Sequence, residues 1–476
     1  MIQKCLLFGV LSIVLLAGCS SISNARNAQS AASRKSSDDA PALFASVDLR
    51  KAGLEELVRF ALTNRPSMVS AALDVKDARL SLKQISADAP LASGMPWNAF
   101  SVSASAGYDA SSSSHRFRKH DWNAAGDPSG AISLGVLIWD FGRYEARARS
   151  LAESVVAAEQ SHIAEGYSVF EEVSGAYFSF LEKRALLEVA CTNEYEYAVH
   201  LEQAEQRVAS GEAKQLDLLR AKLDLAQAKE KTVNSLKDLE TSGAELIKAL
   251  GLEASSSDWR KTVDPGKDAL ARFRGFPDSD CSAAEAFSFA RTNSPAMRIA
   301  RARLRSASAD VDWAVSDLMP EVSASTSIGW TDPLWVWRWG VDAVASIFQG
   351  FRKVTAVDRA AVSLEKASAE VDLEEQALSV AVQIAVAERD NFLAAIETCE
   401  ESLLRAKENL DLVRRQYEVG ESNRADYTQA VSDYVEAMGG RVSAFYGKQR
   451  SEAAIFRLLG IYPVYQENWI VKEGNP

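Results

Sequence analysis

Four short stretches of the chain alternate apolar side chains with serine, glycine or other small residues. They cover residues 98–108, 131–140, 321–330 and 335–348. Because successive side chains of a strand point to opposite faces, this alternation predicts four β-strands, each with one apolar and one polar face. Segments of about ten residues with this pattern are typical of strands in membrane barrels. A soluble two-sheet sandwich is the alternative.

Two long segments without proline are rich in alanine, leucine, glutamate, lysine and arginine, which are strong helix formers. They run from Arg143 to Ala209 and from Arg352 to about Glu418. At 1.5 Å per residue each helix would be about 100 Å long, a length that suits a structure crossing a compartment. Gly211 and Gly420 follow as left-handed caps, and a shorter helix returns from each.

The chain also repeats itself. Three equivalent pairs are each 209 residues apart: Arg143 and Arg352, Gly211 and Gly420, and Gly251 and Gly460. In addition, Phe60–Met68 matches Phe289–Met297, and both contain a Thr-Asn-x-Pro sequence. We therefore predict two equivalent units with the order helix, strand, strand, helix, helix. The first unit covers 41–252 and the second 286–461, with a linker at 253–285 and a tail at 462–476.

The first residues predict an export signal, with Lys4 ahead of a largely apolar stretch at 5–16. The following Leu16-Ala17-Gly18-Cys19 looks like a bacterial lipobox. This resemblance implies removal of residues 1–18 and lipidation of Cys19, with 19–40 as a flexible tether. An ordinary secretory signal with a chance cysteine is the alternative.

After Cys19 the sequence has no apolar run of about 18 residues, so any membrane span is expected to consist of strands. Four strands cannot close a barrel, and open strand edges are not tolerated in lipid. A symmetric trimer would supply twelve strands. Four tryptophans predict an aromatic girdle at the membrane interface: Trp330, Trp335, Trp337 and Trp339.

Composition excludes several classes of function. The net charge of −12 and the pI of about 5.1 argue against nucleic-acid binding. We find no catalytic residues, no metal-ligand spacing and no cofactor motif. Besides Cys5 and Cys19 the chain has Cys191, Cys281 and Cys399, which are expected to be buried free thiols or to include one long-range disulfide.

Taken in order and duplicated, these features resemble the TolC family of outer-membrane export ducts, in its lipidated branch. The residues that carry the resemblance are the Thr-Asn-x-Pro helix starts, Trp139-Asp140-Phe141-Gly142-Arg143 and the turns around Gly211 and Gly420. The resemblance implies an α+β membrane protein in which a trimeric twelve-stranded β-barrel continues into a long α-helical periplasmic barrel. Residues 254–285, 41–58 and 462–476 would form an equatorial belt.

The resemblance also assigns roles at the helix ends. The turns would dock a periplasmic adaptor protein through Val208, Gly211, Glu212, Val419, Gly420 and Glu421. Asp217 and Tyr417 match positions of the gate and would form a carboxylate–phenol hydrogen bond. The family's gate arginine falls at Ser422 here, so its role is absent or taken by Arg424. Gln429 replaces an acidic residue of the constriction.

Four aspartates in this region form two related pairs. Asp217 and Asp224 are seven residues apart, as are Asp426 and Asp433, so each pair lies on one helix face. In a trimer each position would become a ring of carboxylates, which favours cations. A solvated coiled-coil face is the alternative.

Three functions are compatible with the sequence. The first is the outer-membrane exit duct of a tripartite efflux system for drugs or metal ions, with a periplasmic adaptor and an inner-membrane pump of the RND or ABC type. The second is the duct of a type I protein secretion system. The third is a lipid-tethered periplasmic coiled-coil scaffold. In every case the energy would come from a partner, and the exported substrate is left open.

Overall fold

A computed structural model of the chain describes residues 53–85, 90, 100–109, 127–211, 214–252, 282–331, 334–345, 349–419 and 421–461. One compact unit comprises 58–254 and 275–476, and the other comprises 1–57 and 255–274. Almost all described residues belong to the first of these units. The predicted signal, tether and tail, most of the predicted linker, Cys19 and Cys281 lie outside the described residues.

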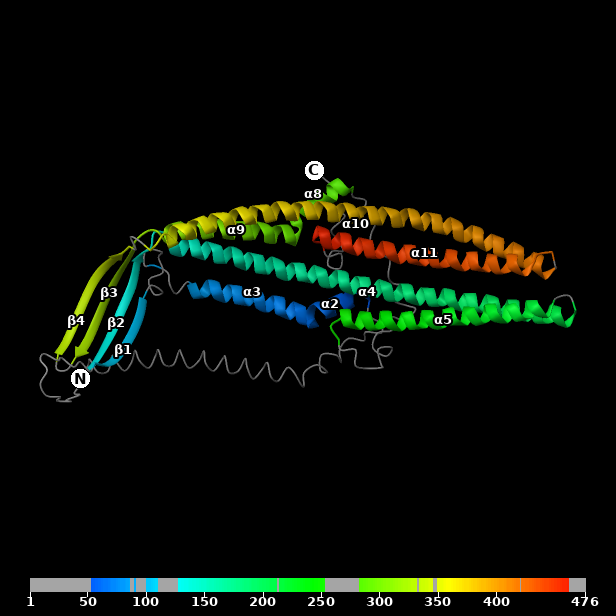
Figure 1. Cartoon of the computed structure of the whole chain (residues 1–476), viewed down its shortest axis with the longest axis horizontal. Coiled ribbons are helices and arrows are strands. Elements are labelled where there is room, and N and C mark those ends of the chain that lie inside the picture. Colours follow the sequence, from blue (N-terminus) through cyan, green and yellow to red (C-terminus); the bar gives the residue numbers. More distant parts are fainter. Residues whose placement is uncertain are drawn as a thin grey trace. The chain divides into compact units, whose positions relative to one another are not determined.

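Two helices of 67 residues dominate the described part of the chain: α4, Arg143–Ala209, and α10, Arg352–Glu418. Each is followed by a shorter helix that packs along it, α5 (Gln215–Ala249) on α4 and α11 (Arg424–Leu459) on α10 (Figure 1). The two predicted helices therefore occur at the predicted residues. A third contact, between α11 and α4, joins the second repeat to the first.

Each repeat also has two short helices ahead of its strands. These are α2 (Leu54–Asn64) and α3 (Pro66–Ile85) in the first repeat, and α8 (Ala283–Asn293) and α9 (Pro295–Ser316) in the second. Proline begins α3 and α9, a position where its missing N–H leaves no helical bond unmade. Helix α3 packs on α4, whereas α9 packs on both α4 and α10, so α9 provides a second link between the repeats.

The end of each repeat meets its own Thr-Asn-x-Pro segment. Gly251, with φ +78°, lies against Arg65, and a Cβ atom there would be 3.3 Å from the Arg65 Cα. Gly460, with φ +69°, lies against Asn293, whose carbonyl oxygen would be 3.1 Å from such a Cβ. The glycine caps and the helix starts therefore recur together because they are in contact.

The strands form one antiparallel sheet in the order β1 (Phe100–Asp109), β2 (Asp127–Trp139), β3 (Glu321–Thr331) and β4 (Leu334–Val344). The central pairing of β2 with β3 joins the two repeats in one sheet. A bulge between Leu137 and Trp139 interrupts the register of that pairing.

Two strand boundaries differ from the prediction by four residues, and pairing explains both; the other differences are one or two residues. Strand β2 begins at Asp127 rather than at 131, because β1 extends to Asp109 and pairs with it. Strand β4 ends at Val344 rather than at 348, because Val344 pairs with Glu321, the first residue of β3. The end of a strand depends on how far the neighbouring strand extends, and the alternation of residues within one strand does not predict this.

The Trp-Asp-Phe-Gly-Arg segment forms the junction between β2 and α4. The Asp140 carboxylate accepts hydrogen bonds from the backbone N–H groups of Gly142, at 3.2 Å, and Tyr144, at 2.6 Å. Arg143 then pairs with Glu321 at 2.6 Å. The segment thus caps the long helix and ties its start to β3.

The apolar core lies between helices rather than around a single centre. One cluster joins α8, α9, α10 and α11 around Met297, Leu378 and Ile455. A second cluster, around Leu410, Tyr417 and Tyr427, joins α10 to α11 near their connecting turn.

Candidate functional site

The sheet has one apolar face that is exposed to the surroundings. The register places opposite residues on the same side of the sheet, so this face is composed of alternate residues of all four strands. Its described members are Val102, Ala104, Ile132, Leu134, Val136, Ala324, Thr326, Ile328, Trp335, Trp337, Trp339 and Val341. Trp335, Trp337 and Trp339 are 73%, 72% and 77% exposed. Such an apolar surface is suited to contact with lipid or with another apolar surface.

The opposite face consists mainly of serine and glycine in its first three strands. It includes Ser101, Ser103, Ser105, Ser133, Gly135, Ser323, Ser325, Ser327 and Gly329, with Arg338 and Asp342 on β4. The predicted alternation is therefore present as two chemically different faces of a single sheet.

Three of the four predicted girdle tryptophans lie side by side along β4. Trp337 is fixed by a 2.9 Å hydrogen bond from its indole N–H to the Thr326 hydroxyl. Trp330 pairs with Trp335 across the strands, and its side chain is not among those described.

The two helical hairpins end in turns that contain the predicted docking residues. In the first turn Gly211 has φ +81° and is exposed, and Val208 is half-buried. In the second turn Val419 is 71% exposed and Glu421 is exposed. Glu212 and Gly420 lie outside the described residues. The described docking residues therefore lie at turns, where a partner can reach them.

An ion pair joins the two repeats beside these turns. The Arg424 guanidinium, in the first turn of α11, donates to the Asp224 carboxylate on α5. Both side chains are about one-quarter exposed, at 23% and 22%. Two predicted gate residues are thus direct partners, and the Asp224 charge is neutralised within the subunit.

The other predicted gate aspartates have different surroundings. Asp433 accepts a 2.7 Å hydrogen bond from Gln429, one turn earlier on α11. Asp426 is exposed, and its backbone N–H donates to the Asn423 side chain, which caps α11. Asp217 is half-buried in the first turn of α5. The four aspartates are therefore chemically unequal, although their spacing is regular.

The hydrogen bond expected between Asp217 and Tyr417 stays a prediction, and the structure describes the contacts of the Tyr417 ring. Tyr417 is buried, and its ring packs against His200, at 5.4 Å between centroids, and Tyr427, at 5.3 Å. The Arg207 guanidinium lies 5.0 Å from the ring centre. The Tyr417 ring therefore contributes an aromatic contact between helices beside the turns.

Sequence reasoning missed two parts of this region. His200 is fully buried between the tyrosines, and the Glu196 carboxylate on α4 pairs with Arg414 on α10. One signal was available, since Tyr417 and Tyr427 are ten residues apart across a turn, where antiparallel helices bring them together. We refer to His200, Tyr417 and Tyr427 as the ring cluster.

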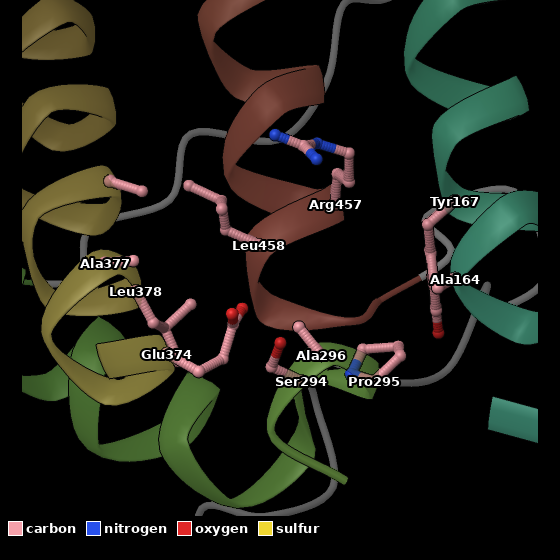
Figure 2. A pocket seen from close by; sticks show the side chains of 11 residues that line it. Ala164, Tyr167, Ser294, Pro295, Ala296, Glu374, Ala377, Leu378, Arg457 and Leu458 are labelled. Carbon is pink, nitrogen blue, oxygen red and sulfur yellow. The ribbon is translucent and has the colours of Figure 1, made fainter. Parts of the chain in front are cut away.

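A cleft of about 200 Å³ lies where the repeats meet, farther from the turns. Figure 2 shows its lining side chains on α4, α9, α10 and α11, with Glu374 and Arg457 among them. Arg457 pairs with Glu171 at 2.6 Å. Burial raises the pKa of Glu171, and the Arg457 charge opposes that rise. The Tyr167 hydroxyl donates to the Gly460 carbonyl, which fixes the end of α11 to α4.

Cys191 and Cys399 are both free thiols. Cys191 is exposed, contrary to the expectation of burial. Among the residues that the structure describes, no three or more His, Cys, Asp or Glu side chains form a group that could hold a metal ion. None of the described helices is both long enough and apolar enough to cross a membrane.

The chain matches the family model described as outer membrane efflux protein, over residues 57–252 and 287–461. Each matched range falls within one of the two predicted repeats, 41–252 and 286–461. None of the curated proteins is similar enough to match the chain.

Several solved structures share the fold. A membrane protein from Pseudomonas aeruginosa is 21% identical, with 90% of this chain and 96% of that chain covered and a TM-score of 0.73. The outer membrane protein VceC from Vibrio cholerae is 18% identical, with coverages of 86% and 96% and a TM-score of 0.70. The open state of the MtrE outer membrane channel from Neisseria gonorrhoeae is 17% identical, with coverages of 88% and 93% and a TM-score of 0.68.

Proposed function

This chain belongs to the outer membrane efflux protein family, and we propose that it is the outer-membrane subunit of a tripartite efflux system. In this role it is a passive exit duct for small molecules, either drugs or metal ions, and has no catalytic activity. A periplasmic adaptor and an inner-membrane pump, of the RND or ABC type, deliver the substrate and supply the energy.

The observation that carries the proposal is the two-faced sheet. Its apolar face, with three exposed tryptophans on β4, is suited to lipid, and its serine- and glycine-rich face is suited to an aqueous lumen. Among the described residues, β1 and β4 each pair along one edge only. Open edges are costly in lipid, so three copies would pool their strands into a closed twelve-stranded barrel.

The helical hairpins supply the rest of the duct. Helices of 67 residues are about 100 Å long at 1.5 Å per residue, enough to extend from the outer membrane deep into the periplasm. The turns at their far ends, with Val208, Gly211, Val419 and Glu421, would dock the adaptor. Glu212 and Gly420 complete the proposed docking surface.

The residues beside the turns would form the gate. Arg424 and Asp224 hold the repeats together by an ion pair, so separation of the hairpins must break it. Asp217, Asp426 and Asp433 would supply the carboxylate rings in the trimer, and these rings favour cations.

Deleting the gene tests the efflux function. We expect greater sensitivity to drugs or metal ions, with secretion of proteins unchanged, because the duct serves small molecules. Loss of a secreted protein with unchanged sensitivity would instead support a type I secretion duct.

Planar lipid bilayers separate a duct from a scaffold. The purified chain is expected to form trimers that resist detergent and to produce stepwise conductance. A protein that stays monomeric, gives no conductance and leaves the membrane once its lipid is removed would be a periplasmic scaffold.

A further inference from the structure

His200 is buried without a hydrogen-bond partner. It lies on α4 with no exposed surface, and neither ring nitrogen has a partner among the described residues. Its ring stacks on Tyr427 of α11, at 5.1 Å between centroids and an interplanar angle of 15°. Tyr417 of α10 completes the ring cluster. Most buried polar side-chain atoms have a hydrogen-bond partner, so a buried imidazole without one is unusual.

The charged groups around the ring cluster are already paired. Glu196 pairs with Arg414, and the Tyr427 hydroxyl lies 3.4 Å from the same carboxylate. Asp224 pairs with Arg424. The ionisable groups of this neighbourhood are Glu196, Tyr197 and Arg207 on α4, Asp224 on α5, Arg414 and Tyr417 on α10, and Arg424 and Tyr427 on α11. Both carboxylates are held by arginines, so a protonated His200 would find no uncommitted carboxylate here.

Burial lowers the pKa of His200 from its ordinary value of 6.5 to about 4, with Asp224 raising it and Arg424 lowering it by smaller amounts. The packed state therefore binds a proton less readily than a separated state in which the ring meets water. The packing of neutral His200 in the ring cluster is therefore fully stable above pH 6.5, and it loses stability as the pH falls toward 4. At pH 5 the packed-to-separated ratio would fall by up to about 30-fold per subunit.

The ring cluster joins elements that must move apart if the turns open. Helix α4 belongs to the first repeat, and α10 and α11 belong to the second. Tyr417 and Tyr427 lie within four residues of the turn between α10 and α11, and His200 lies ten residues before Ser210 at the end of α4. The Arg424–Asp224 ion pair is close to His200. We propose that His200 and the two tyrosines form an acid-released latch, which holds the periplasmic end of the duct closed at neutral pH and frees it on acidification. The latch rests on the proposed function as a duct.

Conductance at different pH values tests the latch. For the full-length protein in planar bilayers we expect the open probability to rise several-fold between pH 7 and pH 5. The variant His200→Phe keeps an aromatic ring in the stack and cannot be protonated, so it should lose this rise. It should also be no more open than the natural protein at pH 7, because the unpartnered nitrogens are gone.

His162→Phe is the matched control, since His162 lies on the same helix, half-buried and beside a different cleft. It should keep the natural response to pH. An equal response in His200→Phe and the natural protein would overturn the latch, and so would a natural protein that conducts equally at pH 7 and pH 5.

Hydrogen–deuterium exchange tests the latch without any conductance. In the natural protein, exchange of residues 410–427, corrected for the intrinsic effect of pH, should increase at pH 5, while residues 378–386 in the other core cluster should not change. If neither protein conducts, the duct fails, and the exchange result still decides the latch. Unchanged exchange at 410–427 would reject it.

Discussion

At the scale of single residues, Gly251 and Gly460 at the ends of the two repeats combine a positive φ with close contacts. Gly460 has φ +69°, and an added Cβ would be 3.1 Å from the Asn293 carbonyl oxygen and 3.3 Å from Pro295 Cδ. Any other residue there would be strained by the positive φ and crowded by the start of α9. Gly251 has the same arrangement against Arg65 in the first repeat.

We expect Gly460→Ala to lower the free energy of unfolding by about 1–3 kcal/mol, through backbone strain and crowding. Gly175→Ala is the matched control, because Gly175 lies within α4 with nothing within 4 Å of an added Cβ. It should be neutral or stabilise by up to about 1 kcal/mol. Denaturant unfolding of both variants measures the difference, and equal effects would contradict the crowding argument.

At the scale of elements, the sheet separates two environments across one layer of backbone. Neighbours in β3 illustrate this, because Ile328 lies on the apolar face and Ser327 on the face rich in serine and glycine. Ile328 is 51% exposed although it is apolar. An exposed apolar side chain at the middle of a strand is stabilised when lipid or another apolar surface covers it, and the proposed barrel places it against lipid.

Lysine at these two positions should have opposite consequences. We expect Ile328→Lys to destabilise the folded membrane form by about 2–4 kcal/mol and to reduce the yield of trimer, because a charge would face lipid. Ser327→Lys should leave the yield near normal, because its charge would face water. Trimer yield in outer-membrane fractions checks both variants, and equal losses would mean that the apolar face does not contact lipid.

At the scale of the whole molecule, the duplicated chain builds one sheet from two repeats and links them again through helices. Ion pairs between α4 and α9 repeat this link along their length: Arg147 with Asp310, Arg149 with Asp312, and Arg305 with Glu153. Because the strands of this sheet supply the membrane contact in the proposed duct, we expect the sheet to hold the subunit in the membrane. The proposed lipid on Cys19 is then not essential.

Replacing the lipidation site tests which anchor is essential. We expect Cys19→Ala, exported by an unrelated cleavable signal, to assemble into some functional trimer, because the strands supply the membrane contact. Trimer in outer-membrane fractions and conductance in bilayers measure this. Complete loss of assembly would show that the lipid is required.

Much of the fold could be predicted from the sequence because its signals are local. The 67-residue helices begin and end at the predicted residues, since helix formers run without proline up to a turn that contains glycine. The alternation in the strands likewise predicted which side chains share a face. The family resemblance was also visible in the sequence, and the family model matches residues 57–252 and 287–461.

The candidate site was predicted only in part. Asp224 and Arg424 were both singled out, but their pairing was not, because they are 200 residues apart in the chain. Glu196 and Arg414 are 218 residues apart, and no sequence pattern links them. Tyr417 packs on the rings of His200 and Tyr427, contacts that no local pattern predicts, and its hydrogen bond with Asp217 stays a prediction.

By itself, the sequence determined the lengths of the helices, the two faces of the strands and the duplication, because each depends on neighbours within a few turns or strand positions. Only the tertiary structure decided which charges neutralise one another and that His200 is buried without a partner. These contacts depend on how each long helix is rotated about its axis against helices from the other repeat. That rotation is set by the packing of many distant side chains, and no local pattern encodes it.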